Sequence, residues 1–97
     1  MKRVINQIDT NTYPEFKQRL QKLPVDIRQQ AQKATKDLLL NPQPKRLRLE
    51  KLRDYKEPSI YTVHVTPNHS HKMSFELRGD VAVMRKIGTH KEIDRSP

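Results

Sequence analysis

Two alternating runs of apolar and polar residues in the final third of the sequence constrain the fold most strongly. The apolar positions are Tyr61, Val63 and Val65 in the first run, and Met73, Phe75 and Leu77 in the second. Successive side chains of a β-strand point to opposite faces, so this spacing predicts two strands with one buried face each. A third apolar run at residues 81–84 follows the turn sequence Arg78-Gly79-Asp80. Strands joined by a glycine turn are typical of an antiparallel meander.

Two amphipathic helices are predicted ahead of these strands. Their apolar residues recur at spacings of three and four, as expected for one face of a helix. The stripes are Phe16, Leu20 and Leu23 in one helix and Ile27, Ala31, Ala34 and Leu38 in the other. Pro24 separates the helices, and Pro42 and Pro44 end the second because proline cannot continue a helix. With a short apolar edge strand at residues 4–8, this order predicts an α+β domain with helices on one sheet face.

The chain is short and strongly basic. Its 97 residues suit one domain spanning residues 1–97, and 20 Lys and Arg against 11 Asp and Glu give a net charge of +9. Such a charge attracts polyanions, although a basic surface can also serve solubility alone. The sequence has no cysteine, no signal-peptide pattern and no apolar run that could span a membrane. We therefore expect a cytoplasmic protein with no membrane partner.

The polar residues that alternate with these apolar positions are the candidates for chemical activity. On the predicted strands this set comprises Thr62, His64, Lys72, Ser74 and Glu76. Imidazole, ammonium and carboxylate groups on one face are suited to acid–base chemistry. The simpler interpretation is a solvent-exposed polar face, which antiparallel sheets commonly present. His90 follows the last strand and is expected to project over the neighbouring face, unless it is merely a solvated loop residue.

A basic segment at residues 45–56 is a candidate phosphate-binding surface. Its cations could neutralise several phosphates of a nucleic acid. They are Lys45, Arg46, Arg48, Lys51 and Arg53. Tyr55 and Tyr61 could stack on bases, but packing roles are more typical of so few aromatics. His69 and His71 lack a third ligand for zinc, so no metal is expected. The absence of a glycine-rich phosphate loop predicts no small-molecule cofactor.

Several ordered segments resemble the RelE/ParE toxin superfamily. The resemblance covers nearly the whole chain after residue 13. Its segments are Leu23-Pro24 with Ile27-Arg28 and Ala31, Leu49-Glu50-Lys51-Leu52, Tyr61-Thr62-Val63-His64-Val65, Ser74-Phe75-Glu76-Leu77, Gly79-Asp80-Val81-Ala82-Val83 and Gly88-Thr89-His90-Lys91-Glu92-Ile93.

The resemblance implies a RelE-like fold, with two N-terminal helices packed on one face of a curved antiparallel sheet. It also implies the toxin of a bacterial toxin–antitoxin pair, neutralised by an acidic, partly disordered antitoxin. Many members cut messenger RNA on the ribosome without a metal ion, through attack of a ribose 2′-hydroxyl on the adjacent phosphate. By position, Lys72 is expected to stabilise the phosphate, and His64 and His90 to transfer protons. Arg85 and the basic segment are expected to hold RNA or ribosome phosphates.

The sequence departs from the family pattern at two of these positions. Asp94 follows Ile93 where similar chains often have tyrosine, and Lys72 stands where arginine is common. Lysine cannot make the two-pronged phosphate contact of arginine. Two alternatives therefore stay open beside the ribonuclease. One is a ParE-like inhibitor of DNA gyrase, which has the same fold, and the other is a degenerate member that binds antitoxin or ribosome without catalysis.

Overall fold

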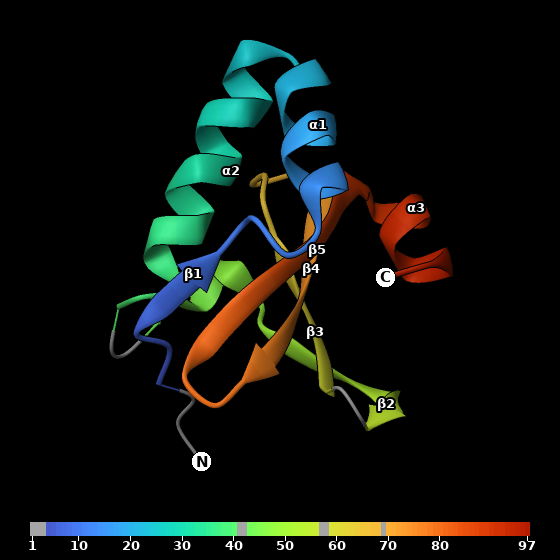
Figure 1. Cartoon of the computed structure of the whole chain (residues 1–97). Helices are drawn as coiled ribbons and strands as arrows, with labels where there is room; N and C mark the ends of the chain where they lie inside the picture. Colours follow the sequence, from blue (N-terminus) through green and yellow to red (C-terminus); the bar gives the residue numbers. More distant parts are fainter. Residues whose placement is uncertain (1–3, 41–42, 57–58, 69) are drawn as a thin grey trace.

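The computed structural model describes residues 4–40, 43–56, 59–68 and 70–97, with the side chains of residues 53–56 left out (Figure 1). It is an α+β fold with three α-helices and a five-stranded sheet. In chain order the elements are β1 (Gln7–Asp9), α1 (Pro14–Lys22), α2 (Val25–Asp37), the 3-10 turn η1 (Lys45–Leu47), β2 (Glu50–Lys56), β3 (Ser59–His64), β4 (His71–Arg78), β5 (Val81–Thr89) and α3 (His90–Arg95).

The sheet is mixed, which corrects the prediction of a purely antiparallel sheet. Its strand order is β1-β5-β4-β3-β2, and β3, β4 and β5 form the expected antiparallel meander. The N-terminal edge strand β1 runs parallel to β5, with Ile8 opposite Ala82. The amide of Asn6 also donates to the carbonyl of Asp80 at 2.9 Å. Apolar character alone could predict this edge strand but not its direction, because direction depends on how the chain returns to the sheet.

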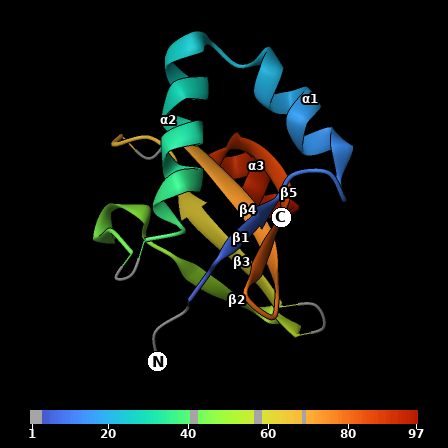
Figure 2. The same ribbon diagram turned by 60° about the vertical axis from the view of Figure 1, so that its left-hand side comes forward.

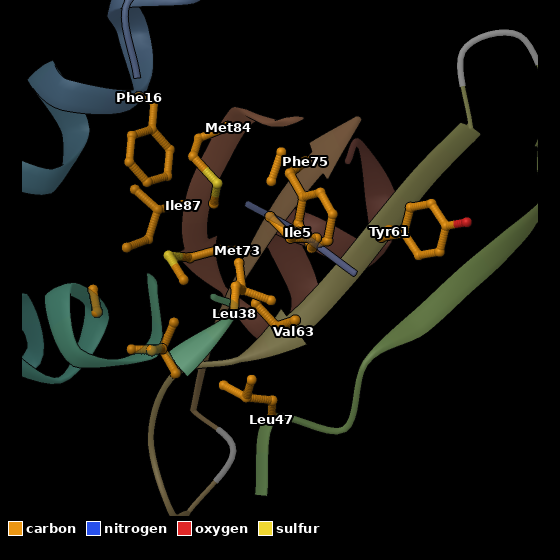
Figure 3. Close-up of a cluster of buried hydrophobic side chains, with 14 residues drawn as sticks. Ile5, Phe16, Leu38, Leu47, Tyr61, Val63, Met73, Phe75, Met84 and Ile87 are labelled. Atoms are coloured by element: carbon orange, nitrogen blue, oxygen red, sulfur yellow. The ribbon is translucent and has the colours of Figure 1, made fainter. Parts of the chain in front are cut away.

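Side chains from α1 and α2 share one core with the strands (Figure 3). The helices contribute Phe16, Ala31, Ala34 and Leu38, and the strands contribute Tyr61, Val63, Met73, Phe75, Met84 and Ile87. The Tyr61 and Phe75 rings stack with their centroids 5.4 Å apart. Most residues of the predicted apolar stripes and runs are thus confirmed as buried, whereas Leu20, Leu23, Ile27 and Leu77 are only partly buried. Figure 2 shows α1 and α2 together at one side of the molecule, with the strands crossing beneath them.

Four of the five alternating polar residues are buried, so the expectation of a solvent-exposed polar face is wrong. Thr62, Lys72, Ser74 and Glu76 are each at most 5% exposed. Lys72 contacts Asp94 of the C-terminal helix α3, which the sequence interpretation missed, whereas Glu76 contacts Tyr13, Arg78 and Arg85. This helix packs against β4 and β5, and its Ile93 is fully buried. Buried polar groups are normally hydrogen-bonded, so each buried polar side chain on this face is expected to have a hydrogen-bond partner.

The start of α3 is fixed by local hydrogen bonds. The hydroxyl of Thr89 accepts from the Glu92 amide at 3.3 Å, and the Glu92 carboxylate accepts from the Thr89 amide at 3.0 Å. This reciprocal pair is a capping box, which satisfies backbone donors that the first helical turn leaves free. The His90 amide also donates to the Ser70 carbonyl in the loop between β3 and β4. The side chains of α3 therefore have a defined position over the sheet.

Candidate active site

The three residues predicted to be catalytic converge on one pocket. His64 ends β3 and pairs in register with Lys72 on β4, and Lys72 pairs with Gly88 on β5. His90 begins α3 two residues after Gly88, so the fold brings it back to the same place. The pocket has a volume of about 320 Å³. It is lined by Glu50, Leu52, Thr62, His64, Lys72, His90, Ile93 and Asp94.

Asp94 connects two of the three predicted residues. Its Oδ1 accepts from Lys72 Nζ at 2.8 Å, and its Oδ2 lies 2.7 Å from His90 Nδ1. The rings of His64 and His90 meet edge to face, with centroids 5.6 Å apart. The hydrogen bond from Lys72 is the main reason why the pKa of Asp94 lies below its usual range, and His90 and His64 lower this pKa further. Asp94 is therefore a carboxylate anion at neutral pH.

Burial differs sharply across this cluster. The Lys72 side chain is only 6% exposed, whereas those of His90 and Asp94 are 43% and 48% exposed. The ammonium group therefore lies at the floor of the pocket, and the imidazole of His90 lies at its mouth. A cation in a poorly hydrated site stabilises developing negative charge more strongly than one in water. This arrangement is suited to an anionic substrate that exchanges protons with a histidine.

Four of the predicted RNA-binding cations lie on the segment that leads into β2, and none of these four lines the pocket. Lys45, Arg46, Arg48 and Lys51 are exposed on η1 and the start of β2. Arg46 forms an ion pair with Asp37 of α2 at 2.6 Å. The strand β2 that carries Lys51 pairs with β3, so this basic surface flanks the strand of His64. The side chain of Arg53 lies outside the described residues, and the proposed contacts of this surface stay predictions.

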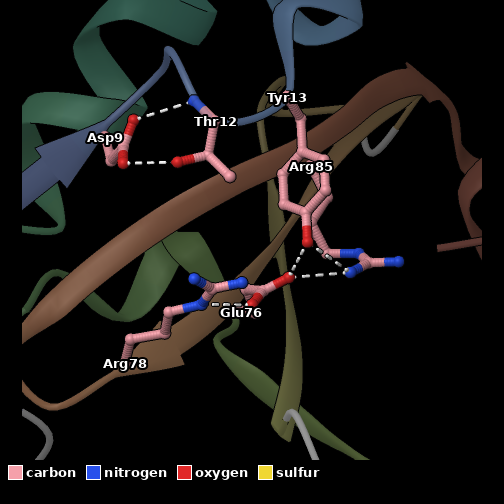
Figure 4. Close-up of polar contacts among 6 residues, drawn as sticks. All are labelled: Asp9, Thr12, Tyr13, Glu76, Arg78 and Arg85. Atoms are coloured by element: carbon pink, nitrogen blue, oxygen red, sulfur yellow. Dashed lines mark hydrogen bonds and ion pairs between the residues drawn. The ribbon is translucent and has the colours of Figure 1, made fainter.

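Arg85 lies in a different cluster, centred on the buried carboxylate of Glu76 (Figure 4). Arg85 Nη1 donates to Glu76 Oε1 at 2.8 Å, and Arg78 Nε donates to Oε2 at 2.6 Å. The hydroxyl of Tyr13 also donates to Oε1, at 2.5 Å. Burial alone raises the pKa of Glu76, but these three hydrogen bonds outweigh it and hold the pKa below its ordinary value. Arg85 is thus engaged in a structural ion pair, and its predicted phosphate contact is untested.

The sequence interpretation did not place Glu50 or Asp94 in the site. The signal for Asp94 was present in the Thr89-x-x-Glu92 spacing, which predicts the start of a helix. Residues four apart on a helix share a face, so such a helix sets Asp94 beside His90. The position of Glu50 had no comparable local signal, because it depends on the pairing of β2 with β3.

The fold has a counterpart among solved structures. This chain is similar to a chain of the RelB–RelE antitoxin–toxin complex from Methanococcus jannaschii, with a TM-score of 0.59 and 21% sequence identity. The likeness covers 94% of this chain and 99% of the other. The present chain therefore shares its fold with a chain of that complex. The resemblance to the RelE/ParE superfamily is thereby confirmed at the level of the fold. The sequence matches no known family model and no curated protein.

Two further properties bear on the site. In the part of the chain that the structure describes, no three His, Asp or Glu side chains are grouped so that they could hold a metal ion. Among the same residues, no helix has the length and apolar character needed to cross a membrane.

Proposed function

We propose that this chain is the toxin of a toxin–antitoxin pair and acts as a metal-independent endoribonuclease on ribosome-bound messenger RNA in the cytoplasm. The likeness to a chain of an antitoxin–toxin complex supports the first part. The net charge of +9 on the present chain fits a toxin rather than an acidic antitoxin. The same charge favours binding to RNA and to the ribosome.

The observation that carries the nuclease proposal is the convergence of His64, Lys72 and His90 on one pocket. Attack of a 2′-hydroxyl on the adjacent phosphate needs one group to remove the hydroxyl proton and another to protonate the leaving 5′-oxygen. The new bond joins the 2′-oxygen to phosphorus, and the bond from phosphorus to the 5′-oxygen breaks. The products are a 2′,3′-cyclic phosphate and a 5′-hydroxyl.

The two histidines take the proton transfers in this reaction, in either order. Their rings lie in contact at the pocket, so both can reach one phosphodiester. The ammonium of Lys72 stabilises the extra negative charge on the phosphorane. Cations of the segment that runs from η1 into β2 hold the flanking RNA or ribosome phosphates. These cations are Lys45, Arg46, Arg48, Lys51 and, in β2, Arg53.

The test is transcript-end mapping after the purified protein, cleared of bound metal with EDTA and then desalted, is incubated with translating ribosomes. We expect cleavage by the wild type and a loss of about 10²–10⁴-fold in rate for His90→Ala. Lys72→Met keeps the aliphatic stem but removes the charge, and we expect a loss of about 10²–10³-fold. His71→Ala is the matched control, because His71 lies on the same strand as Lys72 but bonds to Ser70 instead.

The same preparation separates the ribonuclease from its alternatives. Full activity in both pocket variants would remove His90 and Lys72 from the reaction. Inhibition of gyrase supercoiling without RNA cleavage would favour a ParE-like role. Absence of both effects would leave a protein that only binds its partner. Co-expression with an acidic antitoxin is expected to abolish toxicity, since charge complementarity favours the complex.

A further inference from the structure

Asp94 lies between two of the residues predicted to be catalytic, and its geometry indicates what it does here. Both of its carboxylate oxygens are engaged, one by Lys72 Nζ at 2.8 Å and the other by His90 Nδ1 at 2.7 Å. Asp94 follows His90 by four residues on α3, so one helical turn holds the two side chains together. A carboxylate on Nδ1 of a histidine fixes which ring nitrogen carries the proton.

We propose that Asp94 is a positioning residue that keeps the proton of His90 on Nδ1 and thereby leaves Nε2 to exchange protons with the substrate. This inference rests on the proposed ribonuclease function. The carboxylate also holds the Lys72 ammonium in the same cluster. Asp94 thus links the phosphate-stabilising cation to the proton-transferring imidazole, although it does not contact the reacting atoms.

The proton balance is the same for either assignment of the histidines. As a base, neutral His90 takes the 2′-hydroxyl proton on Nε2 and becomes an imidazolium, whose charge the Asp94 carboxylate stabilises. As an acid, the imidazolium gives its Nε2 proton to the leaving 5′-oxygen. In both cases Nδ1 keeps its proton and its hydrogen bond to Asp94. The unresolved order of His64 and His90 therefore does not affect the inference.

The fold fixes this carboxylate in place. Ile93, the neighbour of Asp94, is fully buried, and the capping box of Thr89 and Glu92 secures the start of α3. The charged and titratable groups that line the pocket with Asp94 are Lys72, His64, His90 and Glu50. The hydrogen bond from Lys72 is the largest cause of the lowered pKa of Asp94. A carboxylate held in this way orients its partner rather than turning freely into solvent.

The test compares the wild type with Asp94→Asn and Asp94→Glu, with Asp26→Asn on the exposed start of α2 as the charge-matched control. The ¹⁵N NMR shifts of the His90 ring report directly which nitrogen is protonated in the whole chain. We expect the Nδ1–H form in the wild type and in the control, its loss in Asp94→Asn and its recovery in Asp94→Glu. Cleavage by Asp94→Asn should fall by about 10–100-fold in kcat with KM little changed, as for other groups that orient a catalytic residue.

Two results would overturn the inference. One is an unchanged Nδ1–H form of His90 in Asp94→Asn, and the other is equal or faster RNA cleavage by that variant. Faster cleavage would mean that Asp94 blocks the anion site of Lys72 instead of orienting His90. If the wild type cleaves no RNA, the proposed function fails, while the NMR comparison still decides whether Asp94 sets the protonated nitrogen of His90.

Discussion

The replacement Glu76→Gln tests the account of the second polar cluster most sharply. The Glu76 carboxylate is fully buried and accepts hydrogen bonds from Tyr13, Arg78 and Arg85 (Figure 4). These residues come from the start of α1, from β4 and from β5, so the carboxylate joins three parts of the chain. Glutamine has nearly the same volume but no charge, and its amide group turns a donor towards one of the existing donors.

The structure sets the size of the expected effect. Removing one partner of a buried ion pair costs about 3–5 kcal/mol, because a charge is left unpaired. Here the side chain of Arg78 is 57% exposed and can turn to water, whereas that of Arg85 is only 27% exposed. We therefore expect a loss at the lower end, about 3 kcal/mol in the free energy of unfolding. For a domain of this size, that loss lowers Tm by about 12–24 °C.

The pH dependence supplies a second check on Glu76. Its pKa in the folded chain lies below the ordinary value of 4.5, so the stabilisation is fully present above the unfolded pKa and is lost as pH falls through the folded pKa. The stability difference between wild type and Glu76→Gln should stay constant from pH 7 to about 5 and shrink below about 4.5. Urea unfolding followed by circular dichroism measures it, with the exposed Glu15→Gln as the control. A loss under about 1 kcal/mol at pH 7, the scale of an exposed ion pair, would refute the reasoning.

Two further changes probe the neighbourhood of the pocket. Thr89→Ala removes the capping box and should lower the free energy of unfolding, measured with urea, by about 1 kcal/mol. RNA cleavage should also fall, because α3 carries His90. Unchanged stability would contradict this role of the cap. Thr62→Val removes a buried hydroxyl that has no hydrogen-bond partner among the described residues. We expect the free energy of unfolding to stay equal or to rise by about 1 kcal/mol, and a clear loss of stability would show that the hydroxyl has a partner in solution.

Local periodicity predicted the parts of this fold that depend on local sequence. The stripes of α1 and α2 and the alternation in β3 and β4 each repeat within a few residues, and most of the predicted side chains are buried. The parallel direction of β1 and the pairing of β2 depend on contacts between distant segments, so no local pattern could reveal them. The short helix α3 had a local signal in Thr89 and Glu92, but its six residues offered little periodicity.

The candidate site also has one part that the sequence predicted and another part that it could not predict. The sequence predicted that His64, Lys72 and His90 belong together, and the structure brings all three to one pocket. It could not predict that Asp94 engages both Lys72 and His90, because this needs the helix over the sheet. The burial of Glu76 was likewise missed, since polar residues on an alternating strand ordinarily face water.

The chemistry of the RNA ends tests the central claim most directly. Messenger RNA bound to ribosomes is incubated with the purified chain, and the termini of the fragments are identified by enzymatic labelling and mass spectrometry. We expect 2′,3′-cyclic phosphate and 5′-hydroxyl ends, which form with protein cleared of metal by EDTA and desalting and disappear when His64, Lys72 or His90 is replaced. Fragments with 3′-hydroxyl and 5′-phosphate ends, or cyclic ends that persist in all three variants, would contradict it.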